Sequence, residues 1–258
     1  MTKRRGTRRV RLPSEQVEDF QRRLIRWYRR RGRDLPWRRT RDPYRILVSE
    51  IMLQQTQVER VRSFYARFVR RYPSIEDLAN AGAGEVREAW DGLGYYARAR
   101  HLHATAKRVM IEHDGRLPDD PVTIRALPGI GRYTAGAVLS FAFGRDAAIL
   151  DTNAARVLAR VFGVSVRGSR ARLQRRLWGV AEDVTPAGRA DVFNQAIMDL
   201  GATVCRARQP ECRRCPVRRA CRFAAVATGT AVGAPTRGGE LNSGSGRSAS
   251  RSRSARDR

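Results

Sequence analysis

Lysine is nearly absent from this chain of 258 residues, which contains only Lys3 and Lys107. Acidic residues are also scarce, because 25 Asp and Glu stand against 52 Lys and Arg and give a formal net charge of +27. A GC-rich coding sequence accounts for the preference for arginine. The net charge itself favours association with a polyanion, and the attraction should weaken steeply with salt. We expect nucleic acid to be this polyanion, because no basic amphipathic helix stands alone as a membrane-binding element would.

Long apolar runs are missing as well. No run reaches the length that crosses a membrane, and the basic start MTKRRGTRRVRLP has no apolar core of a signal peptide behind it. We therefore expect a soluble protein without a membrane partner, in the cytoplasm of a bacterium and associated with the nucleoid. In a reducing compartment, four clustered cysteines indicate a metal site and not disulfides.

Strand signals are also lacking, since no apolar–polar alternation and no Asn-Gly or Asp-Gly hairpin between apolar runs is convincing. We therefore predict an all-α fold. The first helix should start at Ser14 with a capping pattern, and one long helical segment should run from Pro43 to Pro73. Residues 1–13 are predicted to be a disordered basic arm, and residues 227–258 a disordered Gly/Ser/Arg tail, either passively solvated or tethering DNA.

The cysteine cluster is the most specific pattern, with the spacing C-x6-C-x2-C-x5-C over Cys205, Cys212, Cys215 and Cys221. Four thiolates this close can surround one tetrahedral metal ion or one cubane cluster. Zinc sites more often use two CxxC pairs, and only one is present, so the spacing favours a [4Fe–4S] cluster over zinc. The arginines between these cysteines make the loop a positive surface suited to phosphates.

The stretch LPGIGRYTAGAVLSFAFGRDAAILD, residues 127–151, joins a tight Pro-Gly turn, a helix of small residues and the carboxylate Asp151. Gly129 and Gly131 allow backbone N–H groups to approach a phosphate closely, although the turn could serve only to join two helices. Asp151 could likewise only cap the helix that starts at Thr152, since Asp suits an N-cap. A helix-hairpin-helix is predicted over about residues 120–143.

These features resemble the endonuclease III and MutY branch of DNA glycosylases, over about residues 14–225. The segments SEIMLQQTQV (49–58), GLGYYARARHLH (92–103) and FNQAIMDLGATVC (193–205) resemble the MutY type most. The resemblance implies two helical subdomains, with the active site and the DNA groove between them. One is a six-helix barrel of residues 35–145 that contains the hairpin, and the other is an iron–sulfur subdomain of residues 14–34 plus 146–226. We expect a monomer that binds double-stranded DNA containing a mismatch or lesion.

Cleaving the N-glycosidic bond of a flipped-out base requires an acid for the leaving base and a negative charge near C1′. Glu50 lies in an apolar helix, where desolvation raises a carboxyl pKa. By resemblance, Glu50 protonates the adenine ring nitrogen and later handles the water, Asp151 stabilises the oxocarbenium ion by charge or a transient bond, and Asn153 orients Asp151. Tyr133 stands where bifunctional members carry a Schiff-base lysine, which implies a monofunctional enzyme that uses water.

Further residues contact DNA according to the same resemblance. Gln54, Gln55 and Tyr95 would enter the base stack, because an amide can bond base edges and a ring can stack. Trp37 could equally belong to the core. The remaining candidates, in the adenine pocket and the hairpin, are Trp37, Arg38, Leu53, Val58, Gln195, Leu127, Gly129, Gly131 and Thr134.

The expected activity is removal of adenine mispaired with 8-oxoguanine or guanine. MutY proteins generally carry a further C-terminal domain that recognises 8-oxoguanine, whereas this chain ends about 35 residues after Cys221. We therefore expect that domain to be absent and discrimination of 8-oxoguanine from guanine to be weak. A thymine glycosylase branch also carries tyrosine at the position of Tyr133, so a mismatch-specific thymine or uracil glycosylase is the alternative. A catalytically silent DNA-binding protein is disfavoured, because Glu50, Tyr133, Asp151 and Asn153 are all present.

Overall fold

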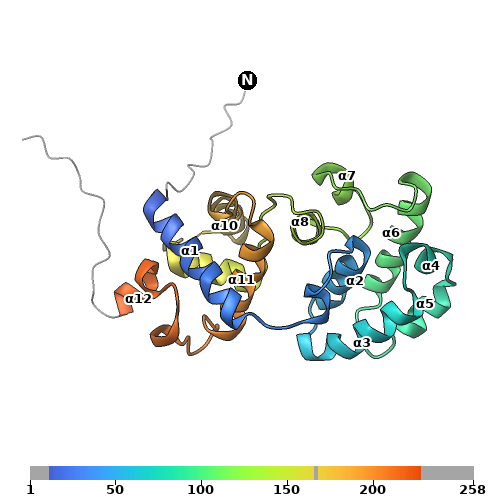
Figure 1. The fold of residues 1–258 in the computed structure, drawn as a ribbon, viewed down its shortest axis with the longest axis horizontal. Helices are drawn as coiled ribbons and strands as arrows, with labels where there is room; N and C mark the ends of the chain where they lie inside the picture. Colours follow the sequence, from blue (N-terminus) through green and yellow to red (C-terminus); the bar gives the residue numbers. More distant parts are fainter. Residues whose placement is uncertain (1–11, 166–167, 228–258) are drawn as a thin grey trace, which may run out of the picture.

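The computed structural model describes residues 12–165 and 168–227 (Figure 1). Within these ranges the chain forms helices and no strand, which confirms the predicted all-α fold. The predicted basic arm and the Gly/Ser/Arg tail lie outside the described residues, apart from residues 12–13 and 227. None of the helices in the described ranges is both long enough and apolar enough to span a bilayer.

The described residues form two hydrophobic cores, which Figure 1 shows as two lobes side by side. The first core is drawn from residues 35–139 and surrounds Trp90 and Phe68. Its helices are η1 (Pro36–Arg38), α2 (Pro43–Leu53), α3 (Val58–Arg71), α4 (Ile75–Asn80), α5 (Ala83–Ala89), α6 (Ala97–Glu112), α7 (Pro121–Arg125) and α8 (Arg132–Phe141).

The second core brings the two ends of the chain together, around Phe20, Phe162 and Phe193. The ring of Phe20 meets the other two edge-on, with centroid distances of 5.4 and 5.9 Å. The chain therefore leaves this lobe after its first helix and returns to it after α8. The helices of the second lobe are α1 (Ser14–Arg31), α9 (Thr152–Phe162), α10 (Arg170–Val184), α11 (Ala190–Thr203), η2 (Cys212–Arg214), η3 (Arg218–Ala220) and α12 (Arg222–Ala227).

Helix α2 forms the centre of the first lobe, where Tyr44 and all residues from Ile46 to Met52 are buried. Asp42 caps it, because its carboxylate accepts from the backbone N–H groups of Tyr44 and Arg45 at 2.9 and 3.3 Å, and Pro43 suits the first turn. The predicted cap of α1 is wrong: Ser14 is already helical, and Pro13 stands at the N-cap without a side-chain bond.

The single long helix predicted between Pro43 and Pro73 is also wrong, because the chain leaves the helix after Leu53 and resumes it at Val58. Gln55, in the intervening turn, has the left-handed φ of 57°. Both helices bury their apolar residues in the same core, so the apolar spacing continues across the turn and conceals the break.

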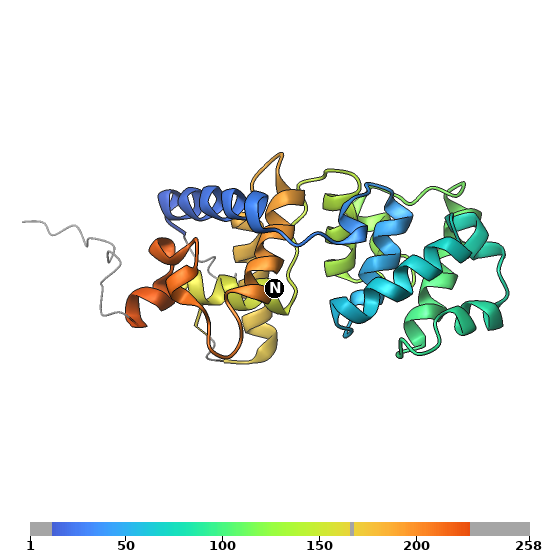
Figure 2. The ribbon, with the colours of Figure 1, turned by 60° about the horizontal axis from the view of Figure 1, so that its bottom comes forward.

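Helix α8 contacts both lobes, packing on α2 and on α11 (Figures 1 and 2). Gly136 on α8 lets the segment before α9 approach this helix closely, since a Cβ there would lie 2.5 Å from the carbonyl oxygen of Ala148. A buried amide adds a polar tie: Asn194 Nδ2 on α11 donates to Ser140 Oγ at 3.0 Å and to the carbonyl oxygen of Ala147 at 2.8 Å. The start of α9 is therefore held at a defined place beside the first lobe.

Candidate active site

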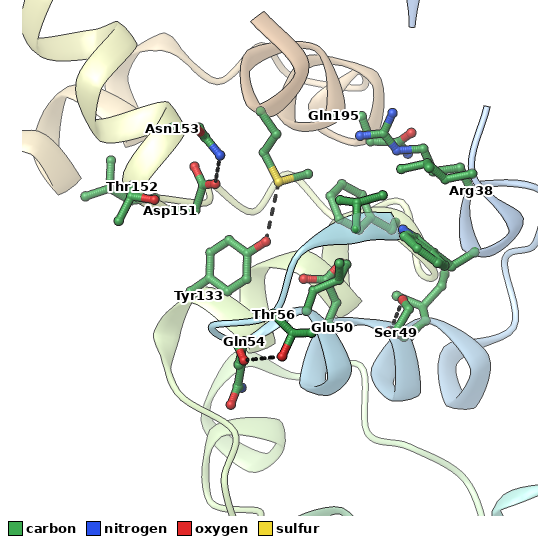
Figure 3. Close-up of a pocket in the computed structure, with 18 of the residues that line it drawn as sticks. Arg38, Ser49, Glu50, Gln54, Thr56, Tyr133, Asp151, Thr152, Asn153 and Gln195 are labelled. Atoms are coloured by element: carbon green, nitrogen blue, oxygen red, sulfur yellow. Dashed lines mark hydrogen bonds between the residues drawn. The ribbon is translucent and has the colours of Figure 1, made fainter. Parts of the chain in front are cut away.

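A cavity of about 870 Å³ lies between the two lobes. The first lobe contributes α2, the turn after it and α8, and the second contributes the start of α9 and part of α11 (Figure 3). The structure brings eleven of the predicted site residues into its wall: Trp37, Arg38, Glu50, Leu53, Gln54, Gln55, Val58, Tyr133, Asp151, Asn153 and Gln195.

The other predicted contact residues lie outside this wall. Tyr95 is 59% exposed in the turn before α6, and Leu127 is buried in the core of the first lobe. Thr134 on α8 accepts from Gln54 Nε2 at 3.4 Å. Gly129 has a φ of 73°, and a Cβ there would lie 2.6 Å from His101 Cβ, so packing alone requires glycine. Gly131 is the N-cap of α8.

Glu50 is a buried carboxyl group in the floor of the cavity, with 4% of its surface exposed. Burial raises its pKa to about 7, while a hydrogen bond from Tyr133 lowers it, the charge of Asp151 raises it and the charge of Arg38 lowers it. Its Oε2 has no hydrogen-bond partner among the described residues. The group is therefore poised to exchange a proton near neutral pH.

Tyr133 projects from the first turn of α8 towards both carboxyl groups (Figure 3). Burial raises its pKa well above the usual value, and the charges of Glu50 and Asp151 raise it further. The phenol is therefore neutral, and its hydroxyl oxygen also lies 3.4 Å from Met198 Sδ, an alternative acceptor for its single proton. A neutral phenol can donate a hydrogen bond here but cannot form an imine with a sugar.

Asp151 is the N-cap of α9, so its position is set by the helix that follows. Its Oδ1 accepts from the backbone N–H of Ala154 at 2.6 Å, and its Oδ2 accepts from Asn153 Nδ2 at 3.0 Å. Burial raises the pKa of Asp151, and these hydrogen bonds oppose that rise. The same carboxylate thus caps α9 and lines the cavity, and the two hydrogen bonds to the start of α9 fix its orientation.

Asn153 is itself held in one orientation. Its Oδ1 accepts from Arg156 Nη2 at 2.7 Å, so the NH₂ group must face Asp151. Arg156 is anchored in turn by the carbonyl oxygens of Gly201 at 2.7 Å and Cys205 at 2.8 Å. Gly201 lies against Asn153 so closely that a Cβ there would be 2.6 Å from Asn153 Cβ.

Sequence analysis missed three residues that position the cavity wall, namely Asp199, Arg33 and Tyr28. Asp199 is buried and accepts from Arg38 at 2.8 and 2.9 Å and from Arg33 Nε at 2.7 Å. Burial would raise the pKa of Asp199, but the two arginines lower it below its usual range. Tyr28 donates to Gln195 Oε1 at 2.5 Å. The spacing Gln195-x3-Asp199, which places both side chains on one helical face, could have found Asp199.

The four cysteines line one small apolar hollow against α9 and α11, together with Val157, Leu200 and Val217. Burial raises the pKa of the Cys215 thiol to about 12, and the other three cysteines add to that rise, so the four sulfur atoms share one environment. Among the described residues no three His, Cys, Asp or Glu side chains are grouped closely enough to hold a metal ion as they stand. An all-sulfur donor set around one hollow nevertheless fits iron–sulfur or zinc chemistry.

The hairpin between α7 and α8 and the cavity beside it, with the carboxyl groups of Glu50 and Asp151 in its wall, define a helix-hairpin-helix protein. A family model that matches residues 48–183 makes the assignment specific. The chain belongs to the HhH-GPD superfamily of base excision DNA repair proteins.

Relatives of two activities resemble the chain. The adenine DNA glycosylase of Homo sapiens is 44% identical over 216 residues, which cover 80% of this chain and 40% of that protein. The thymine-DNA glycosylase of Aeropyrum pernix is 39% identical over 214 residues, which cover 81% of this chain and 96% of that protein. The solved structure of a thermostable thymine-DNA glycosylase is 34% identical with a TM-score of 0.76, covering 82% of this chain and 98% of that one. The chain thus spans less than half the length of the human relative.

Proposed function

We propose that the protein is a monofunctional DNA glycosylase that flips mispaired adenine, opposite 8-oxoguanine or guanine, out of the duplex and hydrolyses its N-glycosidic bond. The observation that carries this proposal is the convergence of Glu50, Tyr133 and Asp151 on one cavity, with the pKa of Glu50 raised to about 7. The 44% identity to human adenine DNA glycosylase supports adenine as the target.

In the proposed reaction the protonated Glu50 gives its proton to a ring nitrogen of the leaving base, so that the base departs neutral as the bond to C1′ breaks. The positive charge that develops on the sugar is stabilised by the carboxylate of Asp151, which Asn153 and the N-terminus of α9 keep in place. Water then attacks C1′, and Glu50 takes up the proton that the water releases.

A monofunctional reaction is supported by the side chains in the cavity wall. No lysine is among the described residues that line it, and Tyr133 stands at the start of α8 where the amine would be required. Lys107 belongs to α6, whereas Lys3 lies outside the described residues. Water is therefore the nucleophile in this proposal, and the product is an intact strand with an abasic site.

We infer that the partner is double-stranded DNA bound by a monomer across the face on which the cavity opens. The hairpin residues Leu127, Gly129, Gly131 and Thr134 would lie against a phosphate, where backbone N–H groups position the duplex without reading its sequence. Gln54, Gln55 and Tyr95 would enter the base stack. The formal net charge of +27 supports a strong, salt-dependent contribution of phosphate contacts to binding.

A mismatch-specific thymine or uracil glycosylase is the second candidate. The observation that favours it is similarity to such enzymes: the Aeropyrum pernix thymine-DNA glycosylase is 39% identical over 214 residues, and the solved thymine-DNA glycosylase is 34% identical with a TM-score of 0.76. Glu50 and Asp151 would serve either base, since the leaving group of both reactions needs a proton and the sugar of both develops positive charge.

The deciding experiment incubates the purified chain with duplexes containing A:8-oxoG, A:G, T:G, U:G or an oxidised pyrimidine, and splits each sample before alkali treatment. We expect adenine to be released from the first two, with strand breaks only after alkali. Breaks before alkali would contradict the monofunctional proposal. Release of thymine from T:G, with A:G untouched, would establish the second candidate instead.

We also infer that Cys205, Cys212, Cys215 and Cys221 hold a [4Fe–4S] cluster, as their shared apolar hollow and uneven spacing support. When bound, such a cluster would fasten the arginine-rich loop. Arg160 already supports this loop, donating to the carbonyl oxygens of Arg206 and Ala207 at 2.7 and 3.0 Å. Metal analysis of the purified chain should find about four iron atoms and matching acid-labile sulfide. One zinc per chain without iron would establish the zinc alternative.

Gly201→Ala is expected to slow base excision roughly 10- to 100-fold, because a Cβ there must push Asn153 and the start of α9 away from α11. The loss of unfolding free energy should be about 1–3 kcal/mol. Single-turnover kinetics and urea unfolding would measure the two effects.

The matched control is Gly179→Ala in α10, where a Cβ meets no atom within 4 Å. That variant should excise at the wild-type rate and gain about 0.5–1 kcal/mol of unfolding free energy. A wild-type excision rate in Gly201→Ala would show that the close approach does not position Asn153.

A further inference from the structure

Arg98 on α6 is a buried arginine, 7% exposed, with no acidic partner among the described residues. The two terminal nitrogens of its guanidinium donate to backbone carbonyl oxygens, whereas Nε has no hydrogen-bond partner among the described residues. Nη1 donates to Met52 at 2.7 Å, to Ile51 at 3.2 Å and to Gln54, all at the end of α2. A positive charge without a carboxylate partner is expensive to bury, and burial lowers the pKa of Arg98.

The other arm of the same guanidinium reaches a second turn. Nη2 donates to the carbonyl oxygen of Gly94 at 2.9 Å, and to that of Leu93 at 3.5 Å. The indole of Trp90 donates to Gly94 as well, at 3.2 Å. Arg98 therefore joins residues 51–54 to residues 93–94, two segments separated by about forty residues of chain.

Both of these turns contain a residue with strained backbone. Gln55 has a φ of 57° and Tyr95 a φ of 53°, in the left-handed region that favours glycine. Each conformation costs on the order of 1–2 kcal/mol and persists only where the surroundings enforce it. The guanidinium of Arg98 supplies bonds directly before each of the two strained residues.

Tyr95 is in addition stacked on Arg98. The guanidinium carbon lies 5.2 Å from the centroid of the Tyr95 ring, although 59% of this residue is exposed. Gln55 lines the cavity wall. Gln55 is thus exposed in the cavity wall, and Tyr95 is exposed on the neighbouring turn, which Arg98 bonds to the turn of Gln55.

We propose that Arg98 is a positioning residue that fastens the turn of residues 54–57 and the turn of residues 92–95 into one rigid wedge, so that Gln55 and Tyr95 enter the DNA together. The inference rests on the proposed function, since a wedge serves to hold the duplex open while a base is flipped. Unstacking a base costs a few kcal/mol. If two flexible loops had to become ordered on binding, their lost entropy would add to that cost, and a wedge that is already rigid avoids this addition.

The planar fork of arginine is required for this role. It offers five N–H donors in fixed directions, and two of its nitrogens here reach different turns. Lysine keeps the positive charge but ends in a single ammonium nitrogen, which cannot occupy the positions of both guanidinium nitrogens at once. Arg98→Lys therefore separates the fastening from the charge.

The test places 2-aminopurine at the target position of a mismatched duplex and uses the inactive Glu50→Gln chain, with and without Arg98→Lys. We expect Arg98→Lys to reduce the fluorescence gain per bound complex at saturation, and to slow single-turnover excision roughly tenfold or more in the otherwise wild-type chain. Affinity for a fully matched duplex should be unchanged. An undiminished gain per bound complex would overturn the proposal, since a merely structural loss would lower only the fraction bound.

Arg100→Lys is the matched control, because Arg100 is exposed on the same helix and undergoes the same chemical change. If Arg98→Lys does not fold, hydrogen exchange of the wild-type chain decides the question. The bonded amides of Thr56 and Leu93 report on the two turns. We expect them to open with one shared free energy; opening of one turn while the other stays protected would overturn the fastening. A wild-type chain that excises no base would refute the proposed function, whereas the exchange experiment judges Arg98 independently.

Discussion

Asp151→Asn is expected to abolish base excision while the protein stays folded and bound to its duplex. The substitution keeps the shape of the side chain and removes its negative charge, which is the property that the proposed reaction uses against the positive sugar. Loss of one such preorganised electrostatic contact slows an enzyme roughly a thousandfold or more. The single-turnover rate constant on an A:8-oxoG duplex measures this loss, and a gel-shift titration measures the binding that should persist.

The fold should tolerate Asp151→Asn because two effects oppose each other. An asparagine retains one oxygen, so the helix cap to Ala154 survives and the bond from Asn153 Nδ2 is lost. The lost bond costs about 1 kcal/mol. The same substitution removes a buried charge, whose burial raises the pKa of Asp151, and this relief offsets the loss.

Asp42→Asn supplies the matched control. Asp42 is also an N-cap aspartate, bonded to the N–H groups of Tyr44 and Arg45 at the start of α2, and it lies outside the cavity wall. This variant should excise at the wild-type rate. Full activity of Asp151→Asn, or an equal loss in Asp42→Asn, would contradict the role proposed for the Asp151 charge.

The helical class and most of the cavity wall could be predicted from the sequence, because they depend on short-range patterns. Apolar spacing and the lack of strand signals predicted the all-α fold, and the resemblance of short segments such as SEIMLQQTQV to MutY proteins predicted Glu50, Leu53, Gln54, Gln55 and Val58, which all line the cavity. A residue that donates to the backbone of a distant turn has no recognisable pattern in the sequence around it. Arg98 is the main example, since a buried arginine in YYARAR looks like any of the fifty arginines of the chain.

The break between α2 and α3 is a second feature that the sequence pattern could not predict. The helical period continues through residues 54–57 because both flanking helices face one core, so the pattern could not locate the turn. The guanidinium of Arg98 donates to the last carbonyl oxygens of α2, and it comes from more than forty residues further along the chain. Asp199 was overlooked for a related reason: its partners Arg33 and Arg38 come 166 and 161 residues earlier in the chain.

Glu50→Gln is expected to abolish excision at every pH and to change how stability depends on pH. A glutamine cannot donate a proton to the leaving base, so the loss of activity should be roughly a thousandfold or more. In the wild-type chain the acid form of Glu50 is lost as the pH rises through about 7, where burial has moved its pKa. The single-turnover rate should therefore fall about tenfold for each pH unit above that value.

The stability effect has a definite sign. Because the pKa of Glu50 is raised from 4.5 to about 7 on folding, the folded chain holds a proton that the unfolded chain releases between these two values. The stabilisation is fully present below pH 4.5 and is lost as the pH rises to about 7, to the extent of about 3 kcal/mol. Glu50→Gln has no such proton, so the wild-type chain should lose about 3 kcal/mol more unfolding free energy than the variant across this interval.

Urea unfolding of both chains at a series of pH values measures that difference, and the titrating groups that do not interact with Glu50 cancel in the comparison. Glu76→Gln is the matched control, because Glu76 is exposed on α4 and lies outside the cavity wall; its stability profile should follow that of the wild-type chain. Parallel profiles for the wild type and Glu50→Gln would show that Glu50 ionises in the folded chain as it does in water. The acid role would then lose its physical basis, because the carboxyl group would hold no proton at neutral pH to give to the departing base.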